Sequence, residues 1–168
     1  MKSTLLSALF SLPILLCSQD TLSTAEFDFW VGQWEVTWDE GEGRIGKGTN
    51  LIEKTLGGPV IQENFRITEG QSNGFQGTSI SVYNPTTKIW KQAWADNQGG
   101  YFDFTGAKDE TGNPVFITAP RTNGDQILIS RMVFKNITKD SFQGDWEGSQ
   151  DGGKTWTLNW RINYKRSI

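Results

Sequence analysis

Histidine is absent from this chain of 168 residues. Its absence excludes the sites that depend on an imidazole, namely Ser-His-Asp triads, zinc held by histidine and haem held by histidine. Any catalysis would have to use carboxylates, tyrosine, lysine or arginine. On this basis we expect no metal site and no cofactor.

Long apolar runs are confined to the N-terminus, where Lys2 is followed by the run Leu5–Leu16. This order of a basic residue and a short apolar run indicates a signal peptide. The run is short for a membrane span, and no later segment is apolar for long enough to form one. We interpret residues 1–25 as signal peptide and short leader, and residues 26–168 as a single folded domain. The protein is therefore expected to be secreted or periplasmic.

Cysteine occurs once, at Cys17 in the leader. The domain that follows it has no disulfide, no thiol nucleophile and no thiolate metal site. A lipid anchor on Cys17 is an alternative to the soluble exported form. Leu16 counts against it, because lipoprotein signals carry a small residue immediately before the lipid-bearing cysteine.

Positive charge is also scarce. Sixteen Lys and Arg against 19 Asp and Glu give a net charge of −3, and no basic run occurs, so a nucleic-acid partner is not expected. Methionine is rare too, with two residues, whereas there are eight tryptophans. Much rigid aromatic surface must therefore be buried or line a binding site.

The stretch 27–38 organises the rest of the chain. An apolar helical turn precedes Gly32, and from Trp34 to Trp38 bulky residues alternate with polar ones, which is the period of a half-buried strand. A helical turn that feeds a strand whose first inward residue is Trp suggests the closed end of a β-barrel. An ordinary first strand with an aromatic core is the simpler alternative.

Short alternating runs separated by turn residues fill the remainder of the chain and predict about ten antiparallel strands. Beyond the first, these strands are expected at 44–54, 59–68, the stretch up to Tyr83, 88–97, 101–107, 114–119, 125–134, 141–150 and 155–165. Closing such a sheet on itself removes its edges, and eight or more strands can enclose one small ligand. We predict an all-β fold: a single closed antiparallel barrel with a short N-terminal helical turn.

Four sequence strings carry a resemblance. Gly32-Gln33-Trp34, within the first of them, resembles the G-x-W signature that opens lipocalins and other calycin barrels. A family of exported bacterial lipocalin-like domains of unknown function is resembled by the string F-x-F-W-V-G-x-W from Phe27, the run W-x-Q-x-W-x-D-N from Trp90, the run W-E-x-S-x-D-G-G-K-T-W from Trp146 and the closing Tyr164-x-Arg166. The resemblance implies a calycin-like barrel and export, but no particular reaction.

Two details of this resemblance concern single residues. Ala95 departs from the family, in which a larger aliphatic residue is usual. Lipocalins also lay an arginine from a late strand across the Trp of G-x-W. Arg161 is the candidate for that contact with Trp34, although Arg161 falls on the polar face of its strand.

Alternation also turns polar side chains toward the barrel interior. Glu63 shares a face with apolar neighbours in 59–68. In 88–97 Lys91 prefers water, and the opposite face is therefore expected to point inward. That face consists of Trp90, Gln92, Trp94 and Asp96.

The strand 125–134 has an ambiguous inward face, because both of its faces are largely apolar. If the face of Arg131 points inward, that arginine must meet a carboxylate or an anionic ligand, since an unpaired buried charge is costly. The strand 155–165 is clearer, and its expected inward face consists of Trp156, Leu158, Trp160, Ile162 and Tyr164.

The predicted ligand site joins these residues: Trp34, Glu63, Trp90, Gln92, Trp94, Asp96 and Arg131. Our leading hypothesis is non-catalytic binding of a small, mostly apolar or amphipathic molecule, with Arg131 or a protonated Glu63 at its polar end. An enzyme of the cyclase, isomerase or hydrolase kind, using Glu63 and Asp96 as acid and base, is one alternative. An internal ion pair of Arg131 with Glu63 or Asp96 that only closes a barrel end is another.

Ser149–Trp156 matches S-x-D-x-G-x-T-W, which resembles the Asp-box of sialidases and other propeller proteins. We expect a hairpin in which Asp151 folds over its own turn and Trp156 anchors the turn to the core. A propeller needs several copies, and only one is present. A carbohydrate-binding module that uses this turn and exposed tryptophans is the remaining functional alternative.

Overall fold

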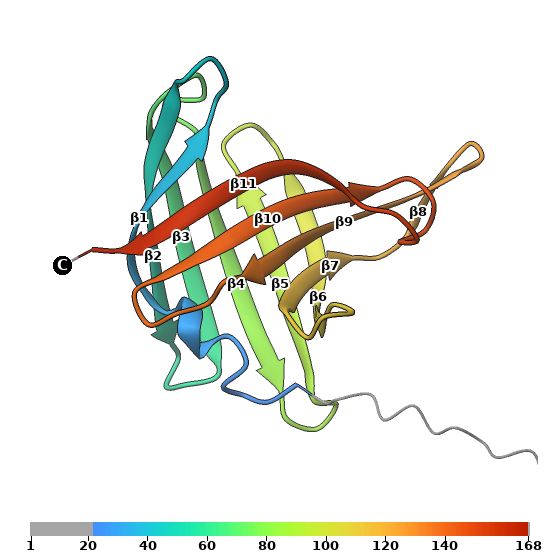
Figure 1. The fold of residues 1–168 in the computed structure, drawn as a ribbon. Helices are drawn as coiled ribbons and strands as arrows, with labels where there is room; N and C mark the ends of the chain where they lie inside the picture. The colour runs from blue at the N-terminus through green and yellow to red at the C-terminus, as the bar shows by residue number, and fades with distance from the viewer. Residues whose placement is uncertain (1–21, 168) are drawn as a thin grey trace, which may run out of the picture.

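A computed structural model describes residues 22–167 as a closed antiparallel barrel of ten strands with one additional strand (Figure 1). A 3-10 helix, η1 (Asp28–Trp30), precedes the barrel. The predicted all-β barrel with a short N-terminal helical turn is therefore confirmed. Most of the predicted signal peptide, including Cys17, lies outside the described residues.

The strands follow the chain almost without interruption. They are β1 (Gly32–Asp39), β2 (Ile45–Thr55), β3 (Val60–Glu69), β4 (Gln76–Asn84), β5 (Ile89–Asp96), β6 (Tyr101–Lys108), β7 (Pro114–Thr118), β8 (Arg121–Asn123), β9 (Gln126–Lys135), β10 (Ser141–Ser149) and β11 (Thr157–Arg166). Neighbours in sequence pair from β1 to β7, then β7 pairs with β9, β9 with β10, β10 with β11, and β11 with β1. The ring closes in this way, and β8 pairs only with β9, outside it.

The helical turn closes one end of the barrel, where Figure 1 shows η1 in blue. Phe27 is fully buried and stacks on Phe116 with ring centres 4.3 Å apart. Trp30 packs on Phe134 at 5.5 Å, and its carbonyl accepts a hydrogen bond of 2.8 Å from the indole of Trp34. The stretch 27–38 therefore forms both the plug and the first strand, as its two periods predict.

Arg166, and not Arg161, lies across the Trp of the G-x-W string. Its guanidinium is 4.1 Å from the centre of the Trp34 ring and donates a hydrogen bond of 3.2 Å to the Val31 carbonyl. A Cβ at Gly32 would collide with this guanidinium, so the glycine makes the close approach possible. The assignment of Arg161 was wrong, because Arg161 points away from the interior and pairs with Asp145.

The register of β9 resolves its ambiguous faces. Met132 pairs with Phe116 on one side and Trp146 on the other, and these residues line the interior. Arg131 therefore points to the outer face, opposite Glu147 of β10.

A bulge shifts the register between β10 and β11. Trp146 pairs with Trp160, but the next residue, Glu147, pairs with Leu158. The skipped residue reverses the alternation, which turns Leu158 and Trp156 to the outer face. The expectation that these two residues point inward with Trp160 was wrong for this reason.

No helix within residues 22–167 has the length and apolar character needed to cross a membrane.

Candidate functional site: an aromatic cavity in the barrel

The barrel interior contains a cavity of about 190 Å³. Sixteen residues line it, and eleven of them are aromatic, so its wall is mostly apolar. For comparison, an apolar cavity of about 150 Å³ accommodates benzene. The space therefore suits a compact molecule with about one ring.

The floor of the cavity is the plugged end of the barrel, where Trp30, Phe116 and Phe134 meet. Five aromatic residues that line the cavity are only partly buried: Phe75, Trp94, Phe102, Trp146 and Trp160. Trp146 and Trp160 pair with each other, further along β10 and β11 from the plug than Phe142 and Tyr164, which contact Trp34. The cavity is thus closed by the plug and has aromatic rings at its opposite end.

Glu63 is the deepest carboxyl group in the cavity wall. It lies on β3, and only 6% of its surface is exposed. Its two oxygens accept hydrogen bonds of 2.7 Å from Nδ2 of Asn50 and from the hydroxyl of Ser79. Gln92 extends this polar ladder, because its Nε2 donates to Ser79 at 3.3 Å and to Ser81 at 3.0 Å.

Burial raises the pKa of Glu63 to about 7, although the hydrogen bonds from Asn50 and Ser79 partly oppose the shift. Burial also raises the pKa of Tyr164, and the nearby charge of Glu63 adds to that effect. Among the salt bridges of residues 22–167, none involves Glu63. A carboxyl group that titrates near neutral pH thus lies in an apolar wall.

Asp96 lies at the aromatic end of the cavity and is partly exposed. One carboxylate oxygen accepts backbone hydrogen bonds from Gln98 at 3.0 Å and Gly100 at 2.8 Å, and the other accepts one from the Trp94 indole at 3.1 Å. Desolvation by burial raises the pKa of Asp96, but these hydrogen bonds outweigh it and leave the pKa below its usual value. Asp96 is therefore a fixed negative charge at neutral pH.

The structure brings four of the seven predicted site residues to the cavity wall: Glu63, Gln92, Trp94 and Asp96. Trp34 and Trp90 are buried deeper, in the core around the plug. The Trp90 indole donates a hydrogen bond of 2.9 Å to the carbonyl of Ser23, which fixes the chain before η1 to the barrel end. These two tryptophans hold the closed end in place and do not line the cavity.

Arg131 lies outside the barrel, so the predicted contact with Glu63 or Asp96 is not formed. It is buried on the outer face, where Nε donates to Glu147 at 2.8 Å and the guanidinium lies 3.7 Å from the centre of the Trp156 ring. The apolar residues on both faces of β9 caused the ambiguity. On the outer face Ile129 and Val133 are buried, whereas Ile127 is exposed.

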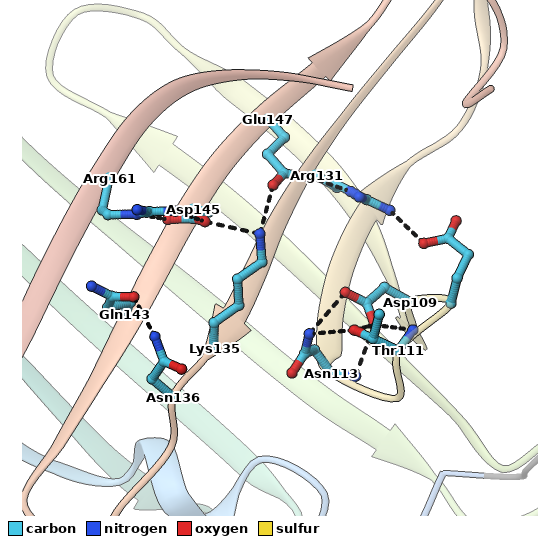
Figure 2. Close-up of polar contacts among 11 residues, drawn as sticks. Asp109, Thr111, Asn113, Arg131, Lys135, Asn136, Gln143, Asp145, Glu147 and Arg161 are labelled. Carbon is cyan, nitrogen blue, oxygen red and sulfur yellow. Dashed lines mark hydrogen bonds and ion pairs between the residues drawn. The ribbon is translucent and has the colours of Figure 1, made fainter. Parts of the chain in front are cut away.

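Figure 2 shows the polar network on this outer face. Asp145 is fully buried and accepts a bidentate pair of 2.7 Å hydrogen bonds from Arg161 and one of 2.9 Å from Lys135. Lys135 also contacts Glu147 at 2.9 Å. The buried carboxylates outside the barrel therefore have cationic partners, in contrast to Glu63.

Several wall residues were not among the seven predicted site residues, including Trp30, Phe102, Phe104, Trp146, Trp160 and Tyr164. Most of them lie on the inward faces that alternation indicates, so that pattern could have found them. Nothing in the sequence distinguishes a ring that lines empty space from one that fills the core.

The Asp-box string forms the expected hairpin turn. Asp151 accepts hydrogen bonds from the backbone amides of Lys154 at 3.0 Å and Thr155 at 2.9 Å, and from the Ser149 hydroxyl at 2.8 Å. These bonds, with one from the Thr155 hydroxyl, hold the pKa of Asp151 well below its usual range. Trp156 anchors the turn on Arg131 at the outer face of the barrel, so the expectation that it packs into the core was wrong.

Comparison of the sequence with protein-family models and with curated proteins gave no match. The fold and the cavity therefore carry the functional argument. Within residues 22–167, no group of three or more carboxylate or cysteine side chains is arranged as a metal site would require.

Proposed function

We propose that this protein is a lipocalin-like barrel that binds one small, compact and mostly apolar molecule in its interior. The cavity is the observation that carries this proposal: its volume is about 190 Å³, and eleven of its sixteen wall residues are aromatic. Apolar pockets with a few convergent polar groups are the usual form of small-molecule sites. Glu63, Gln92 and Asp96 supply such groups here.

The size of the cavity limits the ligand. Drug-sized molecules usually occupy pockets of about 300–1,000 Å³. The smaller space here favours a molecule with about one ring over a long lipid or a polycyclic compound. The rings at the unplugged end, such as Trp94 and Trp146, offer flat faces against which a planar ligand can pack.

The family and the compartment are part of the proposal. The G-x-W string, the plug and the arginine over Trp34 together support a calycin-type barrel. Export rests on the features of residues 1–25, which resemble a signal peptide. We expect the mature domain to act in the periplasm or outside the cell.

Native mass spectrometry of protein purified from its own host tests the proposal. We expect a bound small molecule on the wild type. Met132→Trp should lose it, because Met132 lines the cavity and a larger ring there fills the space. Val82→Trp is the matched control, since Val82 lies on the outer face with 41% exposure. A small molecule that remains bound to Met132→Trp would contradict an interior site.

An acid–base enzyme is the second candidate. The observation that favours it is Glu63, a carboxyl group in the cavity wall whose pKa lies near 7, where a group can both give and take a proton. If the bound molecule is a substrate, Glu63→Gln should abolish its turnover while binding survives. Unchanged turnover in Glu63→Gln would exclude this role for Glu63.

A further inference from the structure

The charges in the cavity wall have one sign. Glu63 and Asp96 are its only carboxyl groups, and no Lys or Arg is among the sixteen wall residues. Arg131, which would have offered an anion a partner, points outward. The interior therefore presents negative potential to anything that enters it.

The buried carboxylates on the outer and inner faces of the barrel differ in their partners. Outside, Asp145 has both Arg161 and Lys135 as cationic partners. Inside, Glu63 is also buried but has only the neutral partners Asn50 and Ser79. Buried charges are normally paired. When Glu63 is ionised, it therefore lacks a cationic partner of the kind that Asp145 has.

Glu63 also has unused hydrogen-bonding capacity. An ionised carboxylate offers about four lone-pair positions, and Asn50 and Ser79 occupy one on each oxygen. A charged donor in the cavity could use the others. Charge-assisted hydrogen bonds of this kind are roughly twice as strong as those between neutral groups.

The aromatic wall also favours a positively charged ligand. The faces of aromatic rings carry negative potential and attract cations, tryptophan most strongly. Trp94, Trp146 and Trp160 lie in the half of the wall away from the plug, where Asp96 is also held. A cation that enters past these rings is attracted along the way, whereas an anion is repelled.

We propose that the ligand is a small organic cation, an amine on a single-ring or similarly compact apolar body, and that the cavity rejects an anion of the same shape. This inference rests on the proposed function. The ammonium group lies at Glu63, the apolar body packs on the aromatic wall, and Asp96 attracts the cation at the end of the cavity opposite the plug. Opposite charges at contact distance in this partly desolvated interior attract more strongly than in water, which decides between the two signs.

Three probes of nearly equal shape test the proposal: benzylamine, benzyl alcohol and benzoate. Isothermal titration calorimetry measures the affinity of each probe at about pH 8. At this pH Glu63 is mostly ionised, because its pKa is about 7. We expect benzylamine to bind at least about tenfold more tightly than benzyl alcohol, and benzoate to bind most weakly. Met132→Trp should block all three.

Charge-removing variants locate the effect. Glu63→Gln should abolish most of the preference for the amine, and Asp96→Asn should reduce it. Asp103→Asn is the matched control, because Asp103 pairs with Lys91 on the outer face and its loss changes the net charge equally. We expect that control to keep the wild-type selectivity. Circular dichroism checks that each variant is folded, and Asp96→Asn provides the test if Glu63→Gln is not.

Proton release gives a second readout. At about pH 7 part of Glu63 is protonated, so an ammonium group bound beside it should displace protons. The binding enthalpy of benzylamine should then differ between phosphate and Tris buffers in the wild type but not in Glu63→Gln. Alcohol or benzoate binding as tightly as the amine, with Met132→Trp still blocking it, overturns the charge preference alone. Failure of all three probes to bind overturns the proposed function as well.

Discussion

The guanidinium of Arg166 lies 4.1 Å from the centre of the Trp34 ring and joins the last strand to the first. Trp34 is in turn bonded to the carbonyl of Trp30, the last residue of η1. The plug, the first strand and the last strand therefore meet in one cluster. This cluster closes the end of the barrel and leaves the cavity with a defined floor.

Arg166→Ala should destabilise the fold by about 1–2 kcal/mol, because it removes a partly desolvated cation–π contact and a hydrogen bond to Val31. Urea unfolding followed by tryptophan fluorescence measures the change. Arg166→Lys should recover only part of the loss, since an ammonium group cannot stack as a planar guanidinium does. Equal stability of Arg166→Ala and wild type would show that the contact does not hold the barrel end.

Glu63 should make the protein less stable as the pH rises. Its pKa is 4.5 in the unfolded chain and about 7 in the fold, so the folded state binds the proton more tightly. The contribution of Glu63 to the free energy of unfolding is therefore fully present below about pH 4.5 and is lost as the pH rises through 7. At about 1.4 kcal/mol for each pKa unit, the loss is about 3 kcal/mol.

Glu63→Gln should remove this pH dependence, because the amide stays neutral and keeps nearly the same shape. Above about pH 8 the variant should then be the more stable protein, and below about pH 4.5 the two should be similar. Unfolding in urea at several pH values measures the difference. Parallel stability curves for the variant and wild type would exclude a raised pKa at Glu63.

The outer-face network gives a further prediction. Asp145→Asn leaves Arg161 and Lys135 without their shared carboxylate, but both cations reach water, with 46% and 29% of their side chains exposed. We expect a loss of about 2 kcal/mol, below the 3–5 kcal/mol for breaking a fully buried pair. Asp103→Asn breaks an exposed pair with Lys91 and should cost less than about 1 kcal/mol. Equal effects of the two variants in urea unfolding would contradict this ranking.

The Asp-box turn should depend on one side chain. Asp151→Ala removes the acceptor for the amides of Lys154 and Thr155, so hydrogen exchange at these two amides should accelerate. Gln150→Ala, one residue earlier in the same turn, should leave their exchange nearly unchanged. Exchange followed by NMR measures both. Protection that survives in Asp151→Ala would show that the backbone holds the turn unaided.

Alternation predicted much of the cavity wall from sequence. Lys91 needs water, and this placed Gln92, Trp94 and Asp96 inside, where the structure has them. The same rule counted against Arg161 as the partner of Trp34, and Arg166, which shares the parity of the inward residue Tyr164, was not considered. The predicted strand ended one residue too early, at 165, to include Arg166.

Two features could not be predicted in this way. β9 is apolar on both faces, with Ile129 and Val133 buried on its outer side, so hydrophobicity gave no inward face for Arg131. The bulge residue between Leu158 and Trp160 also cannot be recognised in an alternating sequence. It reverses the faces of Leu158 and Trp156, which precede it. In both cases, contacts between distant segments decide the result.

A crystal structure of the protein grown with benzylamine shows whether the barrel interior binds a small organic cation. We predict electron density for one ring inside the barrel, against Trp94 and Trp146, with the ammonium group within hydrogen-bonding distance of Glu63. An interior that holds no ligand, with the aromatic side chains packed into the space, would contradict the account.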